Sequence, residues 1–240
     1  MTGPIAPETR DLLQSVADLV IASLPRILVG RSEVTWKADG SPVTAADTYV
    51  EGLVRDFLMA RIPDLSFVGE ESFGEASSLQ GRFLALLDPI DGTENFCSGL
   101  KEWGTSFGLW CEGRHLGSLL LLPELGDRLM SGERIARHRS RISGFSSSYC
   151  DEIGEAIAAT RESRIFGCAV YNLYNVARGA FSRFSNPKGA YAWDLLPGVM
   201  LCLEQGCDVS VDGSRFDGRF LDPHRRYSVD IRHRHDLHPG

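Results

Sequence analysis

Acidic side chains follow directly after two short apolar runs, and this placement is the feature of the sequence that could do chemistry. Glu70 ends one run, and Asp88 and Asp91 end the next. In α/β proteins, ligand sites lie where buried strands end, and Pro89 fixes a backbone angle that lets the chain turn both aspartates inward. Close carboxylates repel one another unless cations lie between them, and Mg²⁺ prefers carboxylate and carbonyl oxygens. The pattern therefore predicts a magnesium site.

The residues after Asp91 add a feature that suits phosphate. Gly92, Thr93 and Glu94 are expected to open a helix. The free N–H groups of a first helical turn, next to a residue without a side chain, suit a phosphate oxygen. A single acid after a strand is more simply a turn or N-cap residue. A generic turn, however, does not need this many acids on adjacent strand ends.

Composition and charge limit the classes of protein. The 240 residues are 43% hydrophobic and 24% charged, which is typical of a globular protein and excludes a disordered chain. A net charge of -7 repels polyanions, so we expect no nucleic-acid partner. The longest unbroken apolar runs, such as Phe83–Leu87, are far shorter than the roughly 20 residues that span a bilayer. With no signal-peptide pattern at its start, the sequence predicts a cytoplasmic protein, with no membrane partner and with reduced cysteines.

Two helices and a set of strands must position the N-terminal acids. Helical spacing of apolar residues predicts a helix over 8–29, kinked near Pro25, and a second helix starting near Thr44. Asp47 and Glu51 are four residues apart and so lie on one side of that second helix. Further segments are expected as a turn at 37–42, strands at 65–68 and 83–87, a hairpin of strands 105–111 and 116–122, and a loop or boundary at 124–142.

The C-terminal half alternates between strand and helix patterns, which favours a layered α/β arrangement. The expected elements are strands at 144–149, 164–167, 180–184 and 207–211, and helices at 151–160, 169–178 and 194–205. Asp194 stands at the start of the last helix, where a carboxylate is favoured, and Pro197 is expected in its first turn. The tail is expected to be solvated around one edge strand, Tyr227–Ile231. Metal binding by its histidines is the alternative; they are His224, His233, His235 and His238.

Several of these segments together resemble a known family. Val68–Ser72, Asp88–Phe96 and Trp193–Gly198 look like the three signatures of the inositol monophosphatase family, and Asp39–Asp47 resembles its entry segment. The likeness covers about residues 37 to 213, in the expected order. It implies an α/β fold of the layered αβαβα sandwich type, Mg²⁺-dependent hydrolysis of phosphate monoesters, inhibition by lithium, and homodimers. We expect one unit over 1–240, with an α+β half (1–142) that carries the metal and phosphate motifs and an α/β half (143–240) that carries the substrate side and the last metal ligand.

The resemblance also implies roles for the matching positions. Those expected to hold two or three Mg²⁺ ions are Glu70, Asp88, the backbone carbonyl of Ile90, Asp91 and Asp194. Asp47 and Thr93, with Glu70, would position and deprotonate the attacking water, and Lys37 would lie near the metals. Those expected to bind phosphate and substrate are Gly92, Thr93, Glu94, Cys168 and Asp194. In the simpler alternatives, Thr93 caps its helix and Lys37 is a solvated loop charge.

The sequence departs from the family pattern around the substrate and not at the metal ligands. The departures are Glu94 in place of a threonine or small residue, Cys168 in place of a serine, Leu196-Pro197 in place of alanine positions, Pro187 at or near the place of an acid that contacts inositol hydroxyls, and a short segment after Pro123. The expected function is a Mg²⁺-dependent phosphatase that acts on a small sugar or polyol phosphate. Alternative substrates within the family are histidinol phosphate, fructose bisphosphate and a nucleoside 3′-phosphate. An alternative of another class is a non-catalytic binding protein, against which the intact acidic cluster argues.

Overall fold

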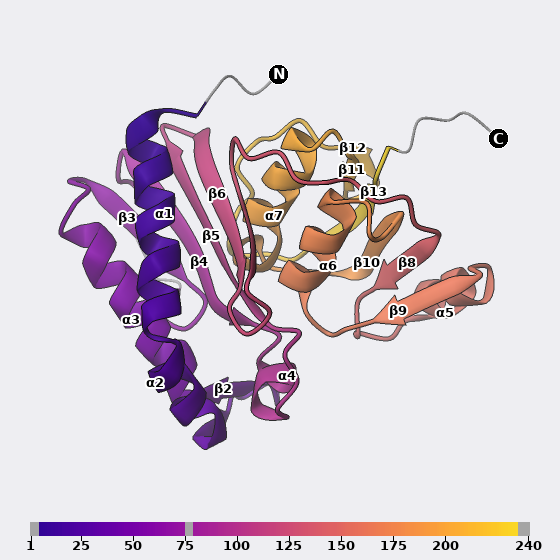
Figure 1. The fold of residues 1–240 in the computed structure, drawn as a ribbon, viewed down its shortest axis with the longest axis horizontal. Coiled ribbons are helices and arrows are strands. Elements are labelled where there is room, and N and C mark those ends of the chain that lie inside the picture. The colour runs from indigo at the N-terminus through magenta and orange to yellow at the C-terminus, as the bar shows by residue number, and fades with distance from the viewer. Residues whose placement is uncertain (1–4, 75–78, 235–240) are drawn as a thin grey trace.

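The computed structural model describes residues 5–74 and 79–234, and within them two β-sheets form the framework of the protein (Figure 1). One sheet has five strands in the order β3-β4-β5-β6-β7, and the other has six in the order β12-β11-β13-β10-β8-β9. The five-stranded sheet ends at Met130 and the six-stranded sheet begins at Ile142. The segment 131–141 therefore joins the two halves.

Helices alternate with the sheets to give five layers, as Figure 1 shows from left to right. Helices α1 (Pro7–Ala22) and α3 (Ala45–Met59) cover the outer face of the five-stranded sheet. Helices α6 (Ala169–Ala177) and α7 (Ala192–Glu204) lie between the two sheets, and α5 (Asp151–Ala158) packs on β10 of the six-stranded sheet. The predicted layered αβαβα architecture is confirmed.

The elements of the first half follow the apolar pattern with some differences. Their bounds are α2 Leu24–Val29, the 3₁₀ turn η1 Gly30–Ser32, β1 Val34–Trp36, β2 Pro42–Thr44, β3 Leu65–Gly69, β4 Phe83–Asp91, α4 Thr93–Cys97, β5 Gly104–Cys111, β6 Arg114–Leu122 and β7 Asp127–Met130. The hairpin of β5 and β6 is confirmed. The expected loop at 124–142 is partly wrong, because β7 pairs with β6 over residues 127–130. The turn at 37–42 joins β1 to β2, a hairpin that the sequence did not predict.

The first predicted helix is broken into two. Helices α1 and α2 meet at Ser23 and are bent by 48° across the break when α2 is counted through Ser32. Pro25 lies in the first turn of α2, where the missing N–H costs little, so it starts a helix instead of kinking one. Among the described helices, none is by itself long and apolar enough to cross a membrane, although this bent pair passes the same test when taken together.

The second half contains strands β8 Ile142–Phe145, β9 Glu162–Ile165, β10 Arg183–Ala190, β11 Asp208–Val211, β12 Ser214–Arg215 and β13 Tyr227–Arg232. The prediction of Tyr227–Ile231 as an edge strand is wrong, because β13 lies between β11 and β10 and pairs antiparallel with both. In the part of the tail that the structure describes, His233 is buried and contacts the carbonyl of Val176, so this part is not wholly solvated. His224 is exposed beside Asp222, and His235 and His238 lie outside the described residues.

Helix α7 begins two residues earlier than predicted, which moves its proline inward. Asp194 is the third residue of the helix, and Pro197 lies in the second turn instead of the first. A proline there removes the hydrogen bond to the carbonyl of Trp193, four residues earlier. The helix is nonetheless held in place because its apolar residues are buried on several sides, between both sheets.

The alternation of side chains along β4 divides the core into two clusters. Ala85 and Leu87 face the cluster under α1 and α3, whereas Leu86 faces the cluster that includes α6, α7 and the second sheet. Successive residues of a strand point to opposite faces, so a sheet covered by helices on both sides is apolar on both. The strand that carries the acids is thus fixed from two sides, up to the point where its carboxylates begin.

Candidate active site

Three carboxylates from separate elements meet at one edge of the five-stranded sheet. Strands β3 and β4 are parallel neighbours, so Glu70, just after β3, and Asp88, near the end of β4, lie side by side. Asp194 approaches from the N-terminal turn of α7. Oxygen atoms of Glu70, Asp88 and Asp194 all lie within 4.8 Å of one another. The structure therefore brings together three of the predicted metal ligands.

The chemistry of this cluster fits a hard divalent cation. Asp88 Oδ1 is buried and has no hydrogen-bond partner among the described residues. Burial, together with repulsion from Glu70 and Asp91, raises the pKa of Asp88 and of Asp194 well above the usual range. Asp194 is held by the backbone N–H of Tyr191, which donates to Oδ2 at 2.9 Å. A buried oxygen without a donor, among like charges, is the arrangement that a bound cation would relieve.

Asp91 ends β4 and is held by the second half of the chain. Its Oδ2 accepts a hydrogen bond from the thiol of Cys168, with Sγ 2.9 Å away, and another from the backbone N–H of Val170. Burial raises the pKa of Asp91 to about 6, although both of these bonds act to lower it. Cys168 also caps α6, because its sulfur accepts the N–H of Tyr171. At 3% exposure, Cys168 is buried, and it is not on the surface where a substrate would first make contact.

Asp47 and Thr93 form a second polar contact beside the acids. Thr44 caps α3, and its N–H and hydroxyl both donate to Asp47 Oδ2, at 2.8 and 2.5 Å. The Thr93 hydroxyl lies 2.9 Å from the carbonyl oxygen of Ile90 and 3.4 Å from Asp47 Oδ1. The hydroxyl has one proton and two possible acceptors, so it donates that proton to only one of the two oxygens at a time. Burial raises the pKa of Asp47 to about 6, against the hydrogen bonds from Thr44.

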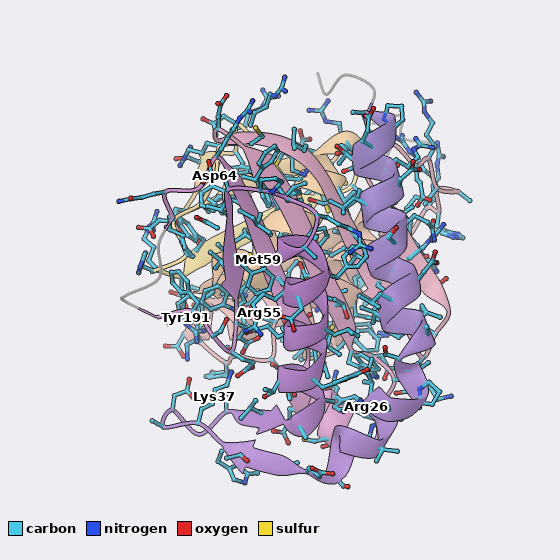
Figure 2. All side chains as sticks on the ribbon, turned by 90° about the vertical axis from the view of Figure 1, so that its left-hand side faces the viewer. Arg26, Lys37, Arg55, Met59, Asp64 and Tyr191 are labelled. Atoms are coloured by element: carbon cyan, nitrogen blue, oxygen red, sulfur yellow. The ribbon has the colours of Figure 1, made fainter. Side chains whose placement is uncertain are left out.

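Lys37 is an ion-paired residue and not a solvated loop charge. It follows β1, and its Nζ lies 2.8 Å from Glu70 Oε1 and 2.8 Å from Glu71 Oε1. Burial acts to lower the pKa of Lys37, but the two glutamates outweigh it and the pKa is raised. Figure 2 shows Lys37 and Tyr191 on the same side of the molecule, consistent with their contacts to Glu70 and Asp194. The lysine therefore neutralises part of the acidic cluster.

The sequence interpretation assigned no site role to two glutamates that support this cluster. Burial raises the pKa of Glu71 to about 7, against its ion pair with Lys37. The buried Glu51 accepts the backbone N–H of Glu71 at 2.8 Å. A Cβ on Gly69 would lie 2.3 Å from Glu51 Oε2, so this close approach requires glycine. The spacing of Asp47 and Glu51 on one helix face was the signal in the sequence that could have identified Glu51 as part of the site.

The remaining predicted residues are spread around the same edge. Gly92 has φ of +81° and is the N-cap of α4, which begins at Thr93 as expected. Glu94 is exposed on α4, and Pro187 lies where the pairing of β10 with β13 shifts register. Aromatic side chains gather beside Asp194: the ring of Tyr191 stacks on Trp193 with centroids 4.8 Å apart, Trp193 meets Phe73, and Phe73 meets His224.

Comparison with known proteins decides the family. The model of the inositol monophosphatase family matches residues 9–162, which is more than half of the chain. The chain belongs to the inositol monophosphatase family. Members of this family are phosphatases that hydrolyse phosphate monoesters, so the chain is a phosphatase of this family.

Individual relatives of this family phosphatase differ in how much they share with it. Inositol-1-monophosphatase of Rhizobium meliloti (strain 1021) is 27% identical over 198 residues, which cover 72% of the chain and 73% of the relative. Histidinol-phosphatase of Chlorobaculum parvum is 39% identical over 102 residues, covering 42% and 38%. A solved IMPase/NADP phosphatase complexed with Mg²⁺ and phosphate has a TM-score of 0.76 at 18% identity, covering 94% of the chain and 90% of that structure. At this identity, the last likeness shows the shared fold.

Proposed function

We propose that this chain is a Mg²⁺-dependent phosphatase that hydrolyses the phosphate monoester of a small sugar or polyol. The observation that carries the proposal is the set of carboxylate oxygens of Glu70, Asp88 and Asp194 within 4.8 Å of one another, with Asp88 Oδ1 buried and without a donor. Asp91 and the carbonyl of Ile90 would complete the ligands for two or three ions. The related structure in complex with Mg²⁺ and phosphate supports this choice of metal.

The chain's own residues position the attacking water and accept its proton. Bound Mg²⁺ would supply positive charge that lowers the pKa of water and neutralises the leaving oxygen. The Thr93 hydroxyl lies 3.4 Å from Asp47 Oδ1, so it can accept the proton of the attacking water while donating its own to Asp47. A base with a pKa of about 6, as at Asp47, is matched to this role near neutral pH. Glu70 would orient the same water from the other side.

Further groups of the same edge would hold the phosphate. The backbone N–H groups of Gly92 and Thr93 lie at the start of α4, next to a position without a side chain. Lys37 would offset part of the negative charge of Glu70 through its ion pair. In this reaction the water oxygen bonds to phosphorus and the phosphorus–oxygen ester bond breaks. The leaving alkoxide takes a proton from a solvent water, and Asp47 afterwards releases to solvent the proton that it accepted.

The first experiment separates a phosphatase from a binding protein with the same fold. Release of inorganic phosphate is measured with a panel of phosphate monoesters, with Mg²⁺ and with EDTA. We expect Mg²⁺-dependent release, with myo-inositol 1-phosphate a poor substrate by kcat/KM because Glu94 and Pro187 stand where the resemblance expects other groups. No release from any ester would favour the non-catalytic alternative. If myo-inositol 1-phosphate is the best of the panel, those differences at the rim are neutral.

Histidinol phosphate is the second candidate substrate. The C. parvum histidinol-phosphatase shares 39% identity over its aligned 102 residues, and aromatic rings lie beside Asp194 in this structure. Flat rings such as Tyr191 and Trp193 pack well against another ring. If histidinol phosphate is the substrate, its kcat/KM should exceed that of the sugar and polyol phosphates. The KM for histidinol phosphate should also rise about tenfold or more in Tyr191→Ala, because one of the packing rings is lost. Fructose bisphosphate and a nucleoside 3′-phosphate complete the panel.

A monovalent cation provides a test of the metal geometry. If one of the metals is loosely held by the acidic edge, Li⁺ should compete for that position, as the family resemblance implies. We expect activity to fall at LiCl concentrations on the order of tens of millimolar, a range suited to a weak site for hard cations. Potassium chloride at equal concentration controls for ionic strength. Equal activity in the two salts would contradict this geometry.

A further inference from the structure

Asp91, which we take as a metal ligand in the proposed function, and the start of α6 come from different halves of the chain, and they make direct contact. Asp91 ends β4 in the first half, whereas Cys168 and Val170 begin α6 in the second. Both donate to the same oxygen, Oδ2, the thiol at an Sγ–oxygen distance of 2.9 Å. With both of these donors on Oδ2, Oδ1 is the oxygen that would face a cation, and the backbone N–H of Ala169 also acts on this carboxylate. In effect a carboxylate of one half serves as an acceptor for the N-terminal groups of a helix in the other.

Two further contacts hold the same segments together. A Cβ on Gly92 would lie 2.9 Å from the Cβ of Cys168, so the glycine next to Asp91 packs directly on the cysteine. Asn95 on α4 donates its side-chain N–H₂ to the carbonyl of Phe166 and to that of Glu102. The segment 166–168 is thus fixed against 91–95 along its length. Cys168 cannot move without moving Asp91.

We propose that Cys168 is a positioning residue for the metal site, whose thiol holds Asp91 in the orientation that leaves Oδ1 for a cation. The proposal rests on the proposed function in that it takes Asp91 as a metal ligand. A thiol is a weaker donor than a hydroxyl but serves here because the acceptor is a buried carboxylate, and hydrogen bonds to charged groups are the stronger ones. The position where the family resemblance expects serine therefore keeps its donor in this chain, with sulfur in place of oxygen.

The test compares Cys168→Ala and Cys168→Ser by a measurement that does not need catalysis. The melting temperature is followed against Mg²⁺ concentration, and the half-point is the concentration that gives half of the maximal rise. We expect Cys168→Ala to raise this half-point about three- to tenfold, since it removes a donor to a charged group. Cys168→Ser keeps a donor and should stay within about twofold of the wild type. The Mg²⁺ half-point for phosphate release should move in parallel.

Cys202→Ala is the matched control. Cys202 is buried in the same hydrophobic cluster as Cys168. It donates to the carbonyl of Leu173 and also interacts with Cys207, so these contacts include no acid of the site. Its loss should lower the metal-free melting temperature without changing the Mg²⁺ half-point. Infrared spectra give a second readout. The S–H stretching band of Cys168 is identified by its loss in Cys168→Ser, and that of Cys202 by its loss in Cys202→Ala. In Asp91→Asn the Cys168 band should shift and the Cys202 band should not.

The outcomes separate this inference from the proposed function. If Cys168→Ala lowers the melting temperature as Cys202→Ala does and leaves the Mg²⁺ half-point unchanged, Cys168 is only a core residue and the inference is wrong. It is equally wrong if Cys168→Ser behaves as Cys168→Ala does. In both cases the wild type still binds Mg²⁺ and releases phosphate. A wild type that neither is stabilised by Mg²⁺ nor releases phosphate overturns the proposed function instead, and the inference with it.

Discussion

At the scale of single residues, the site is a balance between repulsion and a few fixed contacts. Glu70, Asp88 and Asp194 are close enough to repel strongly, and Lys37 offsets only part of that charge. Asp47 stands apart from the three, bonded to Thr44 at one oxygen and facing Thr93 at the other. The acids therefore divide into those that would face a cation and one that faces the Thr93 hydroxyl, and substitutions should divide in the same way.

The first prediction tests this division with isosteric amides. Asp91→Asn and Asp194→Asn each remove a charged oxygen that we propose as a ligand, so Mg²⁺ affinity measured by calorimetry should fall by more than about tenfold, because the loss of a ligand costs more than the loss of an outer-shell partner. High Mg²⁺ should partly restore their activity. Asp47→Asn should lose turnover at nearly unchanged Mg²⁺ affinity. Asp56→Asn, an exposed change on the same helix as Asp47, is the control. Equal Mg²⁺ affinity in all four variants would contradict the assignment.

The second prediction concerns pH in the absence of metal. The pKa is about 6 for Asp47 and Asp91 and about 7 for Glu71, each above the ordinary value. The folded protein therefore binds more protons than the unfolded chain between about pH 4 and 7, so each group lowers stability as pH rises, by up to about 1.4 kcal/mol per unit. In EDTA, the melting temperature should rise as pH falls from about 7.5 to 5.5, and Glu71→Gln should flatten this slope.

The pKa shift of His115 changes stability with pH in the opposite direction to the shifts of the acids. Burial lowers the pKa of His115 to about 4, so it favours the folded state increasingly as pH rises from about 4 to 6.5. Its contribution is common to the wild type and Glu71→Gln and cancels in their difference. Saturating Mg²⁺ should remove the rise at low pH, because protons then compete with the metal. Identical slopes with EDTA and with Mg²⁺ would show that the acids are not coupled to the metal.

At the scale of elements, the local motifs were predictable and the contacts between them were not. The start of α3 at Thr44 and of α4 at Thr93 follows from local chemistry, a capping threonine and a glycine with positive φ. The charged residues Asp127 and Arg128 hid β7, whose neighbour β6 supplies the pairing. The contact of Cys168 with Asp91 joins positions far apart in the chain. Spacing alone carries no signal for such a contact.

The third prediction isolates one of these contacts between elements. Gly92 and Gly113 both have positive φ, +81° and +75°, but a Cβ at Gly92 would meet Cys168 and one at Gly113 would meet nothing within 4 Å. Gly113→Ala should cost only the backbone term, about 1 kcal/mol of unfolding free energy. Gly92→Ala should cost about 2–4 kcal/mol, because displacement of packed atoms is added. Urea denaturation measures both. Equal losses would mean that the contact with Cys168 is not tight.

At the scale of the whole molecule, the site joins two halves that each have a sheet. Glu70 and Asp88 belong to the five-stranded sheet, whereas Asp194 comes from α7, which packs against both sheets. A ligand that binds only the folded arrangement stabilises every part that it requires. A cation at this edge would therefore link the stability of the two halves.

The fourth prediction measures that linkage by hydrogen exchange. Mg²⁺ should increase the protection of backbone amides in β4 and α7 together, with little effect on α5, which lies on the far side of the second sheet. In Asp194→Asn the increase in α7 should be lost or strongly reduced. Protection confined to β4 in the wild type would mean that the metal site is built by the first half alone.

The position of β13 has a consequence for how the chain reaches its folded state during synthesis. Strands β10 and β11 leave the ribosome before β13, yet each pairs with β13 and not with the other. Until residues 227–232 emerge, both strands present open hydrogen-bonding edges next to apolar faces, the condition that favours mispairing and aggregation. The five-stranded sheet does not wait for a late strand, since all its strands lie before residue 131. A nascent chain should thus carry a completed first sheet while its second sheet still lacks the central strand β13.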